Sequence, residues 1–385
     1  MELVFHCDQE HHGLKPLTWT RPVAVLRVGI LTIAGKWSRY LSATTVSFHT
    51  ADHLAAKYPL SSSKDTLHLR GGLLPTPALV AAVQALKDGQ RLVSGDEWLA
   101  HRQGDDQRVF DGDVQIVQRP HQIFQWNATE MDRDFELLTA NRRSQKIASS
   151  NTVIGDRIFL EPGAKVEASV LNASDGPIYL AADSEIMEGC TVRGGLALGE
   201  HSQLKMGAKV YGATTIGPHC KVGGEVNNCV FWGYSSKAHD GFLGNSVIGQ
   251  WCNLGADTNN SNLKNDYGMV KQWHVPSGRF LSTGLQFCGL IMGDHSKSGI
   301  NTMFNTGTVI GVSCNVFGAG FPRSVIADFS WGGASGQTIY RLDKALATAE
   351  RVLARRDMLM DAVESDMLSA IFAQTAKNRG GTGIA

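Results

Sequence analysis

One histidine, His239, lies in a stretch whose composition suits neither a helix nor a strand. Residues 235–264 read SSKAHDGFLGNSVIGQWCNLGADTNNSNLK, with many glycines and small polar side chains and no clear periodicity. A histidine titrates near neutral pH, so it can take a proton from a reacting group. Taken alone, the stretch favours a corner histidine held by backbone groups, and a catalytic role needs further support.

A second group of residues that could do chemistry lies near the start of the chain. His6, Cys7, His11 and His12 fall within FHCDQEHHGLKP. Their spacing matches no common zinc-ligand pattern, so we interpret this segment as a solvent-facing loop and predict no metal site. The seven cysteines are scattered singly without a C-x-x-C pair, which favours reduced thiols over a disulfide framework.

The composition excludes several classes of protein. The 36 basic and 36 acidic residues cancel, and no Lys/Arg run predicts binding to nucleic acid or to an anionic membrane surface. No basic segment precedes an apolar one at the start, and no apolar run reaches the roughly 18 residues of a membrane span. We therefore expect a cytoplasmic protein, and the length of 385 residues predicts two or three units.

A six-residue repeat must position these side chains. The aliphatic positions are Ile186, Val192, Leu198, Leu204, Val210, Ile216 and Val222, then Phe242, Ile248 and Leu254 at the same spacing, with a weaker copy at Ile154, Leu160 and Val166. A small residue, several times cysteine, usually stands two positions earlier. Neither the helical period nor the strand period gives six, whereas a coil with three short flat faces does. The repeat predicts a parallel β-helix whose coils bury their core by stacking.

The repeat divides the chain into three predicted parts. Residues 1–150 mix strand patterns (ELVFH, TTVSF, RVFDGDVQIV) with helix patterns (PALVAAVQALKDG, GDEWLAHR), which predicts an α/β domain. Residues 151–335 hold the β-helix, and a loop leaves it at 265–280, the kind of segment that often meets a substrate. Residues 336–385 predict one or two terminal helices.

The sequence resembles the bifunctional N-acetylglucosamine-1-phosphate uridyltransferase/glucosamine-1-phosphate N-acetyltransferase family, in a short variant of Bacteroidetes type. KAHDGFLGNSVIGQWCNLGADTNNSNLK follows the family's H-L-x-Y-x-G-D-x-x-I-G…N-x-G-A-G-T…N segment without gaps, and MGDHSKSGIN extends the match to archaeal sugar-phosphate acyltransferases. LKPLTWTRPVAVLRVG is similar to the end of a sugar nucleotidyltransferase signature. The resemblance implies a left-handed β-helix acyltransferase domain after a truncated nucleotidyltransferase-like domain.

The resemblance also implies roles in acetyl transfer. His239 is the general base, Glu225 orients or polarises it, and the backbone amide of Ala256 stabilises the thioester oxyanion. The residues implied for substrate binding are Asn253, Asn262, Lys264 and Lys271, together with Phe242 and Asn227, which stand where the family has tyrosine and lysine. These two departures leave the acceptor sugar less defined than the acyl transfer.

The implied acyl donor is acetyl-CoA, with Lys297 as a candidate for its phosphates. The groove for this donor is completed by a neighbouring subunit in the family, so a homotrimer is implied. The expected function is N-acetylation of an amino-sugar 1-phosphate, glucosamine 1-phosphate above all, in UDP-N-acetylglucosamine biosynthesis.

The first domain departs from its family where nucleotide chemistry needs it most. The glycine-rich phosphate loop is replaced by FHCDQEHHGLKP, whose carboxylates would face the triphosphate, and Val23 replaces an expected lysine. Lys15 and Arg21 are the remaining candidates for nucleotide binding, with Mg²⁺ needed only if nucleotidyl transfer is retained. We expect that activity to be lost or altered. A nucleotidyltransferase, a bifunctional enzyme and a non-catalytic regulatory subunit remain the alternatives.

Overall fold

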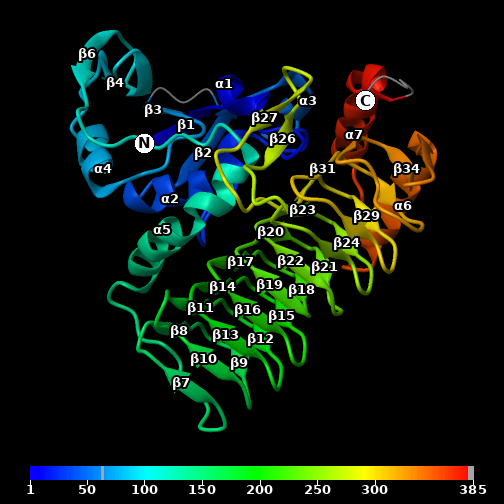
Figure 1. The fold of residues 1–385 in the computed structure, drawn as a ribbon. Coiled ribbons are helices and arrows are strands. Elements are labelled where there is room, and N and C mark those ends of the chain that lie inside the picture. Colours follow the sequence, from blue (N-terminus) through cyan, green and yellow to red (C-terminus); the bar gives the residue numbers. More distant parts are fainter. Residues whose placement is uncertain (62–64, 380–385) are drawn as a thin grey trace. The chain divides into compact units, whose positions relative to one another are not determined.

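The structure is a computed structural model, and it describes residues 1–61 and 65–379 (Figure 1). An α/β unit is followed by a left-handed parallel β-helix and C-terminal helices, which confirms the predicted architecture. Two compact units emerge from the packing, one of Met1–Arg27 with Leu31–Pro120, the other of Val28–Ile30 with the chain from His121 onward. The packing thus divides the chain some 30 residues before the predicted domain boundary at 150.

The first unit is built on a mixed sheet with strand order β2-β1-β3-β5-β4-β6. The strands are β1 Glu2–His6, β2 Thr45–His49, β3 Thr66–Arg70, β4 Gln90–Ser94, β5 Glu97–His101 and β6 Asp106–Val109. The helices are α1 Asp8–His11, the 3-10 helix η1 Val23–Val25, α2 Ile33–Tyr40, α3 Asp52–Ala55 and α4 Pro77–Gln84. Strands β1, β2 and β3 are parallel, whereas β5 runs antiparallel to β3 and β4.

Two predictions for this unit were wrong. GDEWLAHR was expected to be a helix, but Glu97–His101 forms β5, which pairs with β4 through a tight turn at Gly95, whose φ is +55°. Pairing between strands overrides a weak local preference for helix here. The segment at Cys7 was expected to be a solvent-facing loop, but Cys7 and His11 are buried and the residues form the end of β1 and the helix α1.

The β-helix has three faces, each a parallel sheet of short strands. Face 1 contains β7 Thr152–Ile154, β10 Val170–Asn172, β13 Thr191–Arg193, β16 Lys209–Tyr211, β19 Glu225–Asn227 and β22 Phe242–Gly244. Face 2 contains β8 Ile158–Leu160, β11 Ile178–Leu180, β14 Leu196–Leu198, β17 Thr214–Ile216, β20 Val230–Gly233, β23 Val247–Gln250, β28 Ile291–Met292, β31 Val309–Ile310 and β33 Val325–Ile326. Face 3 contains β9 Lys165–Val166, β12 Glu185–Ile186, β15 Gln203–Leu204, β18 Lys221–Val222, β21 Ser236–Lys237, β24 Asn253–Leu254, β29 Lys297–Ser298, β32 Asn315–Val316 and the antiparallel pair β34 Ser330–Gly333 and β35 Gly336–Ile339.

Beyond β22, face 1 is continued by β25 Asn259–Asn260, which pairs in parallel with β30 Met303–Phe304. The segment between β25 and β28 leaves the coil and carries an antiparallel hairpin of β26 Lys271–His274 and β27 Arg279–Ser282. This excursion lies where the sequence predicted a loop to leave the scaffold.

The predicted repeat describes the core well but not throughout. Ile186, Val192, Leu198, Leu204, Val210, Ile216, Val222, Ile248 and Leu254 are all buried. At face 1, however, Leu243 pairs with Val226 and is buried, while Phe242 points outward, so its assignment to the repeat was wrong. The cause is a shortened coil, because Val222 pairs with Lys237 only 15 residues later. Ile154, in the first coil, is 44 % exposed and also departs from the predicted core.

One corner of the β-helix carries a column of stacked rings. The rings are those of His201, His219, Tyr234, Trp251 and His295, with centroid separations of 5.0, 4.6, 4.2 and 6.4 Å between successive members. Each residue has a positive φ between 53° and 62°, and each amide donates to a carbonyl of the preceding coil. We call this column the corner ladder.

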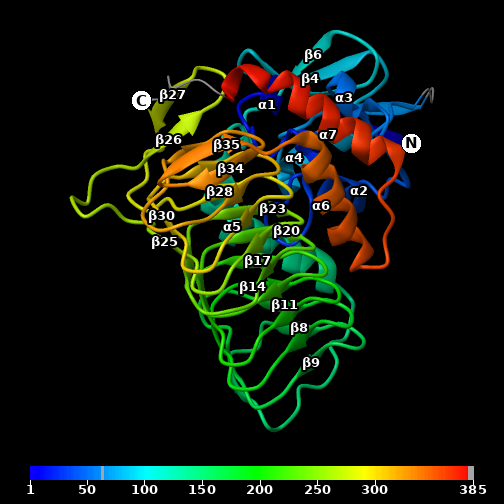
Figure 2. The same cartoon turned by 90° about the vertical axis from the view of Figure 1, so that its right-hand side faces the viewer.

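The C-terminal helices α6 Leu342–Ala354 and α7 Ala362–Gln374 lie beside the last coils, followed by the 3-10 helix η2 Ala376–Asn378 (Figure 2). The connection between α6 and α7 contacts the corner ladder at one point, and α7 contacts it at another. Arg356 donates to the carbonyl of His219 over 3.1 Å, and Glu364 lies 3.5 Å from His295 Nε2. The predicted terminal helices therefore pack along a flank of the β-helix.

The helix α5 Pro120–Thr139 is held against face 2 in part by one buried amide. Asn127, fully buried, donates from Nδ2 to the Ala213 carbonyl over 2.7 Å and to the Thr215 hydroxyl over 3.1 Å. Its Oδ1 accepts the Gly29 amide over 2.8 Å, which ties Val28–Ile30 to the same unit.

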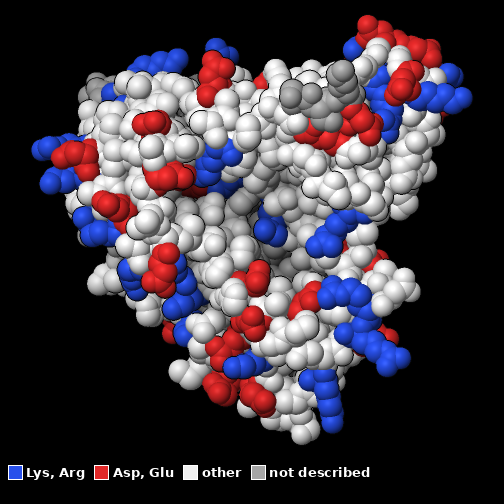
Figure 3. Space-filling view, turned by 180° about the vertical axis from the view of Figure 1, so that it is seen from behind, with Lys and Arg blue, Asp and Glu red and all other residues white. Residues whose placement is uncertain are grey.

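The surface carries both signs of charge. On the side seen in Figure 3, basic and acidic side chains are interspersed, as expected for a net charge of zero. Among the helices of the described residues, none has the length and apolar character needed to cross a bilayer.

Candidate active site at a corner of the β-helix

His239 lies at the corner between face 3 and face 1, after β21 and before β22, and its side chain is exposed. Ala256 occupies the same corner one coil later, because the amide of Asp257 donates to the carbonyl of Asp240 over 2.9 Å. The structure therefore brings the predicted base and the predicted oxyanion donor onto adjacent turns. The carbonyl of Ala256 accepts the amide of Asn301 from the following coil.

Two glycines allow the coils to approach closely at this corner. A Cβ on Gly224 would lie 2.9 Å from the carbonyl oxygen of His239, and a Cβ on Gly241 would lie 2.3 Å from that of Thr258. Both glycines have a positive φ, +72° and +117°, a backbone conformation that residues with a Cβ rarely adopt. The glycine content of the stretch is thus explained by packing of backbone against backbone.

Lys237 holds the turn that presents His239. It takes the core position that Val222 fills one coil earlier, and its Nζ donates to the carbonyls of Gly223 over 3.0 Å and of His239 over 2.7 Å. Burial lowers the pKa of Lys237 to about 8, against the opposite influence of Asp240. The sequence reasoning missed this residue, although the break in the repeat after Val222 marks its place.

Glu225, the predicted partner of His239, makes a different contact. Its Oε1 accepts the hydroxyl of Tyr211 over 2.6 Å, and this bond, together with burial, raises the pKa of Tyr211. Among the described residues no hydrogen bond or ion pair joins Glu225 to His239. The two residues are nevertheless close in the fold, since Gly224 packs against the backbone of His239.

The outward side of face 1 gathers three predicted substrate residues. Phe242 pairs with Glu225, and Asn227 pairs with Gly244. A Cβ on Gly244 would lie 2.6 Å from both Phe242 Cζ and Asn262 Nδ2, so these two side chains converge over the glycine. Asn262 donates from Nδ2 to Asn245 Oδ1 over 2.8 Å.

Two asparagines missed by the sequence reasoning build this surface. Oδ1 of Asn259 accepts the amide of Phe242 and Oδ1 of Asn260 accepts the amide of Gly244, each over 2.8 Å. Side-chain amides thus replace the backbone pairing that would otherwise join β22 to β25. They hold the start of the excursion against the corner of His239.

The predicted lysines meet in a pocket at the base of that excursion. The pocket has a volume of about 400 Å³, and its lining residues are Ser261, Leu263, Lys264, Asn265, Val270, Lys271, Asn305 and Thr306. Lys271 is exposed, Lys264 is ion-paired with Asp266 over 3.3 Å, and the hydroxyls of Ser261 and Thr306 lie 2.9 Å apart. Two ammonium groups and two hydroxyls suit an anion such as a phosphate.

Asn253 and Lys297 lie elsewhere, paired in register on face 3. Asn253 is exposed, while Lys297 is half-buried and donates to the carbonyl of His295 over 2.8 Å. Burial lowers the pKa of Lys297. The two asparagines that the resemblance placed in one sugar pocket therefore stand on different faces, on either side of the corner of His239.

In the first unit, both predicted nucleotide-binding residues are buried. Arg21 is 2 % exposed and Lys15 8 %, with Lys15 Nζ lying 3.5 Å from the centroid of the Trp19 ring. Glu10, expected to face a triphosphate, is buried and paired with Arg70 over 2.5 Å. The single glycine, Gly13, allows a close approach, since a Cβ there would lie 2.6 Å from the carbonyl of Gln118.

Within the part of the chain that the structure describes, His6 is the one N-terminal histidine that joins a cluster of possible metal ligands, and its partners His68 and His101 come from distant strands. Burial lowers the pKa of His6 and of His101 to about 4, and the neighbouring imidazole of His68 adds to both shifts. Burial also lowers the pKa of His68, while the carboxylate of Glu2 acts in the opposite direction.

Comparison with known proteins supports the resemblance. The family model described as sugar nucleotidyl transferase matches residues 3–143. "Bifunctional protein GlmU" of Synechococcus elongatus is 26 % identical over 167 residues, which cover 41 % of this chain and 33 % of that protein. The protein of the same name from Methanocaldococcus jannaschii is 34 % identical over 90 residues, 23 % of this chain and 21 % of that protein.

The chain is similar to bifunctional GlmU proteins. The predicted resemblance to this bifunctional family is confirmed, and the chain spans about a third or less of the length of these GlmU relatives. The solved structure of UDP-N-acetylglucosamine acyltransferase from Campylobacter jejuni covers 62 % of this chain and 93 % of its own, with a TM-score of 0.24 and 15 % identity. The Arabidopsis UDP-N-acetylglucosamine acyltransferase has a TM-score of 0.19 and 12 % identity over the same shares.

The match of the sugar nucleotidyl transferase family model extends through α5, although α5 packs in the second unit. The helix is therefore part of the first domain by sequence and part of the β-helix unit by contact. This dual membership explains why the predicted boundary at 150 and the packing boundary at 120 differ.

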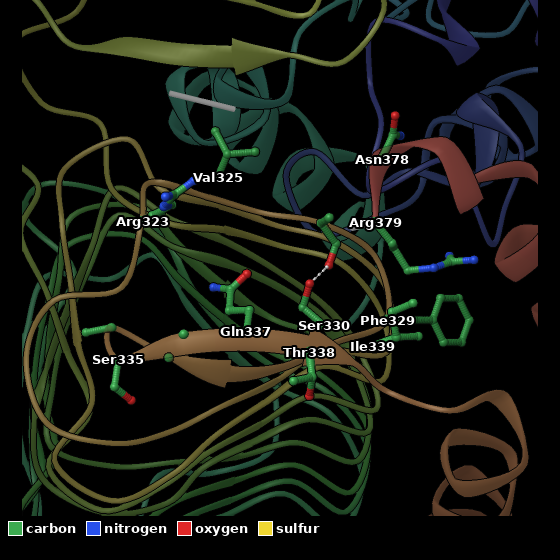
Figure 4. Close-up of a pocket in the computed structure, with 14 residues that line it drawn as sticks. Arg323, Val325, Phe329, Ser330, Ser335, Gln337, Thr338, Ile339, Asn378 and Arg379 are labelled. Atoms are coloured by element: carbon green, nitrogen blue, oxygen red, sulfur yellow. Dashed lines mark hydrogen bonds between the residues drawn. The ribbon is translucent and has the colours of Figure 1, made fainter. Parts of the chain in front are cut away.

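A larger pocket, of about 500 Å³, lies at the C-terminal end of the β-helix (Figure 4). Arg323 and Val325 line one side, Gln337 and Thr338 lie on the hairpin of β34 and β35, and Asn378 and Arg379 complete the lining. None of the predicted site residues lines it. Its size alone gives no reason to prefer it to the corner of His239.

Proposed function

We propose that this protein is an acetyl-CoA-dependent N-acetyltransferase acting on an amino-sugar 1-phosphate, with glucosamine 1-phosphate as the preferred acceptor. The observation that carries the proposal is the meeting of Lys264 and Lys271 in one pocket, directly after Asn262 in the chain. Similarity to GlmU proteins supports the reaction class.

His239 is the proton acceptor in this proposal. The sugar amine attacks the thioester carbonyl, its proton passes to the His239 imidazole, and the CoA thiolate leaves and is then protonated. The backbone amide of Ala256, on the adjacent turn, supplies the donor for the oxyanion that forms during attack. Lys237 positions the imidazole by anchoring the His239 carbonyl.

The acceptor lies over face 1. Its phosphate is bound by Lys264 and Lys271, and its ring contacts Asn262, Phe242 and Asn227. Glu225, held by Tyr211, orients the histidine or the sugar from the neighbouring strand.

The donor lies over face 3, beside Asn253 and Lys297. A groove of this kind is completed by a second copy of the chain, so we propose a homotrimer as the active assembly. Sedimentation of the intact protein tests the assembly, and a monomeric active species would contradict it.

The decisive experiment is an acceptor panel for thiol release from acetyl-CoA. We expect glucosamine 1-phosphate to be turned over faster than glucosamine, which lacks the phosphate, and faster than glucosamine 6-phosphate, which carries it at the wrong end. Equal rates of thiol release with glucosamine and glucosamine 1-phosphate would contradict phosphate binding by the lysine pocket. No turnover with any amino sugar would favour a non-catalytic regulatory subunit.

Nucleotidyl transfer is the second candidate, and the family match to residues 3–143 favours it. The burial of Lys15 and Arg21 argues against direct contact of either side chain with a nucleotide. Pyrophosphate release from UTP, Mg²⁺ and N-acetylglucosamine 1-phosphate by the full chain would establish this activity. Absence of such release would mean that the protein does not catalyse nucleotidyl transfer from UTP to this sugar phosphate.

A further inference from the structure

Three histidines from separate strands face one another on one side of the first unit's sheet. In the strand register, His68 pairs with Val4 in β1 and with His101 in β5. Because side chains alternate along a strand, Val4, His6, His68 and His101 point to the same side. His6 Nε2 and His68 Nδ1 are 2.9 Å apart, and one ring nitrogen from each of the three histidines lies within 4.8 Å of the others.

These separations are close to those of a metal centre. Three nitrogens bound to a tetrahedral zinc ion at about 2.0–2.1 Å stand roughly 3.3 Å from one another. To reach that arrangement the rings would have to rotate, including a change in the parallel stack of His68 and His101, whose centroids are 4.4 Å apart.

The surroundings already contain a supporting contact. His68 uses Nδ1 toward His6, while its Nε2 lies 3.1 Å from the hydroxyl of Thr66. Metal-binding imidazoles commonly fix their second nitrogen in this way, which sets the ring orientation.

Two buried polar groups nearby lack partners. Glu2 is only 3 % exposed, and neither of its carboxylate oxygens has a hydrogen-bond partner among the residues the structure describes. Its register partner is Thr66, so it lies on the same side of the sheet as the histidines. Nδ1 of His101 is likewise buried with no hydrogen-bond partner in the described chain. Buried carboxylates are seldom left without compensation, and a nearby divalent cation would offset the charge.

We propose that His6, His68 and His101 bind one divalent transition-metal ion, zinc or a close equivalent, through three imidazole nitrogens. Imidazole ligands suit zinc and its neighbours in the first transition row, whereas Mg²⁺ prefers oxygen. Three protein ligands leave a fourth position for water or another small ligand, as in metal sites that bind a substrate. This site is separate from the proposed acetyltransferase site and does not depend on it.

Cobalt(II) titration of the untagged, chelator-treated full chain tests the proposal. We expect one equivalent of Co²⁺ to give the visible absorption of a tetrahedral nitrogen-bound ion, and one equivalent of Zn²⁺ to abolish it. His68→Gln should weaken Co²⁺ binding by at least about 10-fold, the scale seen when metal surroundings are altered. The matched control is His201→Gln, which removes a stacked histidine from the β-helix instead.

A second readout needs no histidine variant. The ring of Trp98 meets that of His6 edge-on, with centroids 5.4 Å apart, so a bound Co²⁺ or Cu²⁺ should quench its fluorescence. The quenching should saturate at one equivalent and be lost in Trp98→Phe. Absence of stoichiometric Co²⁺ binding, or binding that is unchanged in both His68→Gln and His101→Gln, would overturn the proposal and leave the cluster as a stack of packed imidazoles.

Discussion

The two units of this protein assemble the surroundings of their candidate site histidines in different ways. In the first unit, His6, His68 and His101 come from strands far apart in sequence and meet on one side of a sheet. In the β-helix, His239 and its neighbours come from consecutive coils, and each coil places its residues directly beside those of the next. A solenoid corner can therefore be read from a local motif, whereas a sheet cluster becomes visible only when the strand order is known.

The largest effect expected on the β-helix side is that of His239→Ala. Loss of the general base should lower kcat for acetyl transfer by about 10²–10⁴-fold while leaving the assembly intact. Thiol release with saturating glucosamine 1-phosphate measures the change. His201→Ala, another exposed histidine of the same unit, is the control, and an equal loss in both variants would mean that the corner of His239 has no special role.

The lysine pocket is expected to act on binding. Lys264→Ala with Lys271→Ala should lower kcat/KM for glucosamine 1-phosphate by about 10–100-fold, mainly through KM, since two charge-assisted contacts to the phosphate are lost. Lys271→Ala alone should account for most of the effect because Lys264 is shared with Asp266. The same variants should act on unphosphorylated glucosamine like the wild type, and a uniform loss on both acceptors would contradict phosphate binding.

Lys237 gives a test that depends on pH. Its pKa is lowered to about 8 in the folded chain and is near 10.4 in an unfolded one, so between these values the unfolded chain binds more protons. The free energy of unfolding of the wild type should therefore rise relative to Lys237→Met as the pH increases from 8, by about 2 kcal/mol at pH 9.5. Urea unfolding of both proteins at pH 7 and 9.5 measures this difference. The same change with pH in both free energies of unfolding would show that the lysine is solvated.

The smallest effect is expected on Co²⁺ affinity, and it tests whether the proposed metal site and the proposed acetyltransferase site act independently. Thr66→Val should weaken Co²⁺ binding by about 10-fold through loss of the contact to His68, whereas Thr45→Val, on the neighbouring β2, should not. Removal of the metal by a chelator should leave acetyl transfer unchanged, because the proposed acetyltransferase residues all lie in the other unit. A fall in the rate of acetyl transfer on chelation would contradict the independence of the two proposed sites.

The contrast also explains what the sequence could predict. Aliphatic residues at every sixth position predicted the β-helix and its core because each coil repeats the same local requirement. Phe242 was wrongly assigned to the core and Lys237 was missed because a 15-residue coil shifts the phase, a change that a fixed period cannot anticipate. His68 and His101 lie in no recognisable motif, and the segment of β5 was mistaken for a helix. The sheet that brings the three histidines together could therefore not be predicted from the sequence.

At the candidate site, the motif named His239, Lys264 and Lys271 as site residues, but it did not predict the contacts among the residues around them. Glu225 was expected to orient His239, yet its carboxylate accepts the Tyr211 hydroxyl. Asn253 and Asn262 were expected together, yet a coil places nearby residues on different faces whenever a corner falls between them. Spacing along a chain does not give direction in space until the positions of the corners are known.

The corner ladder has a consequence for how the β-helix holds its register. Its five members all adopt the left-handed backbone conformation without being glycine, which costs roughly 1–2 kcal/mol for each residue. Ring stacking and the amide bond to the preceding coil offset that cost only when the coils are aligned, so a coil displaced by one residue would keep the strain and lose the stack. The corner ladder therefore favours correctly aligned coils, and in a β-helix shortened from one end the last residue of the ladder would keep its strained backbone and lose a stacking partner.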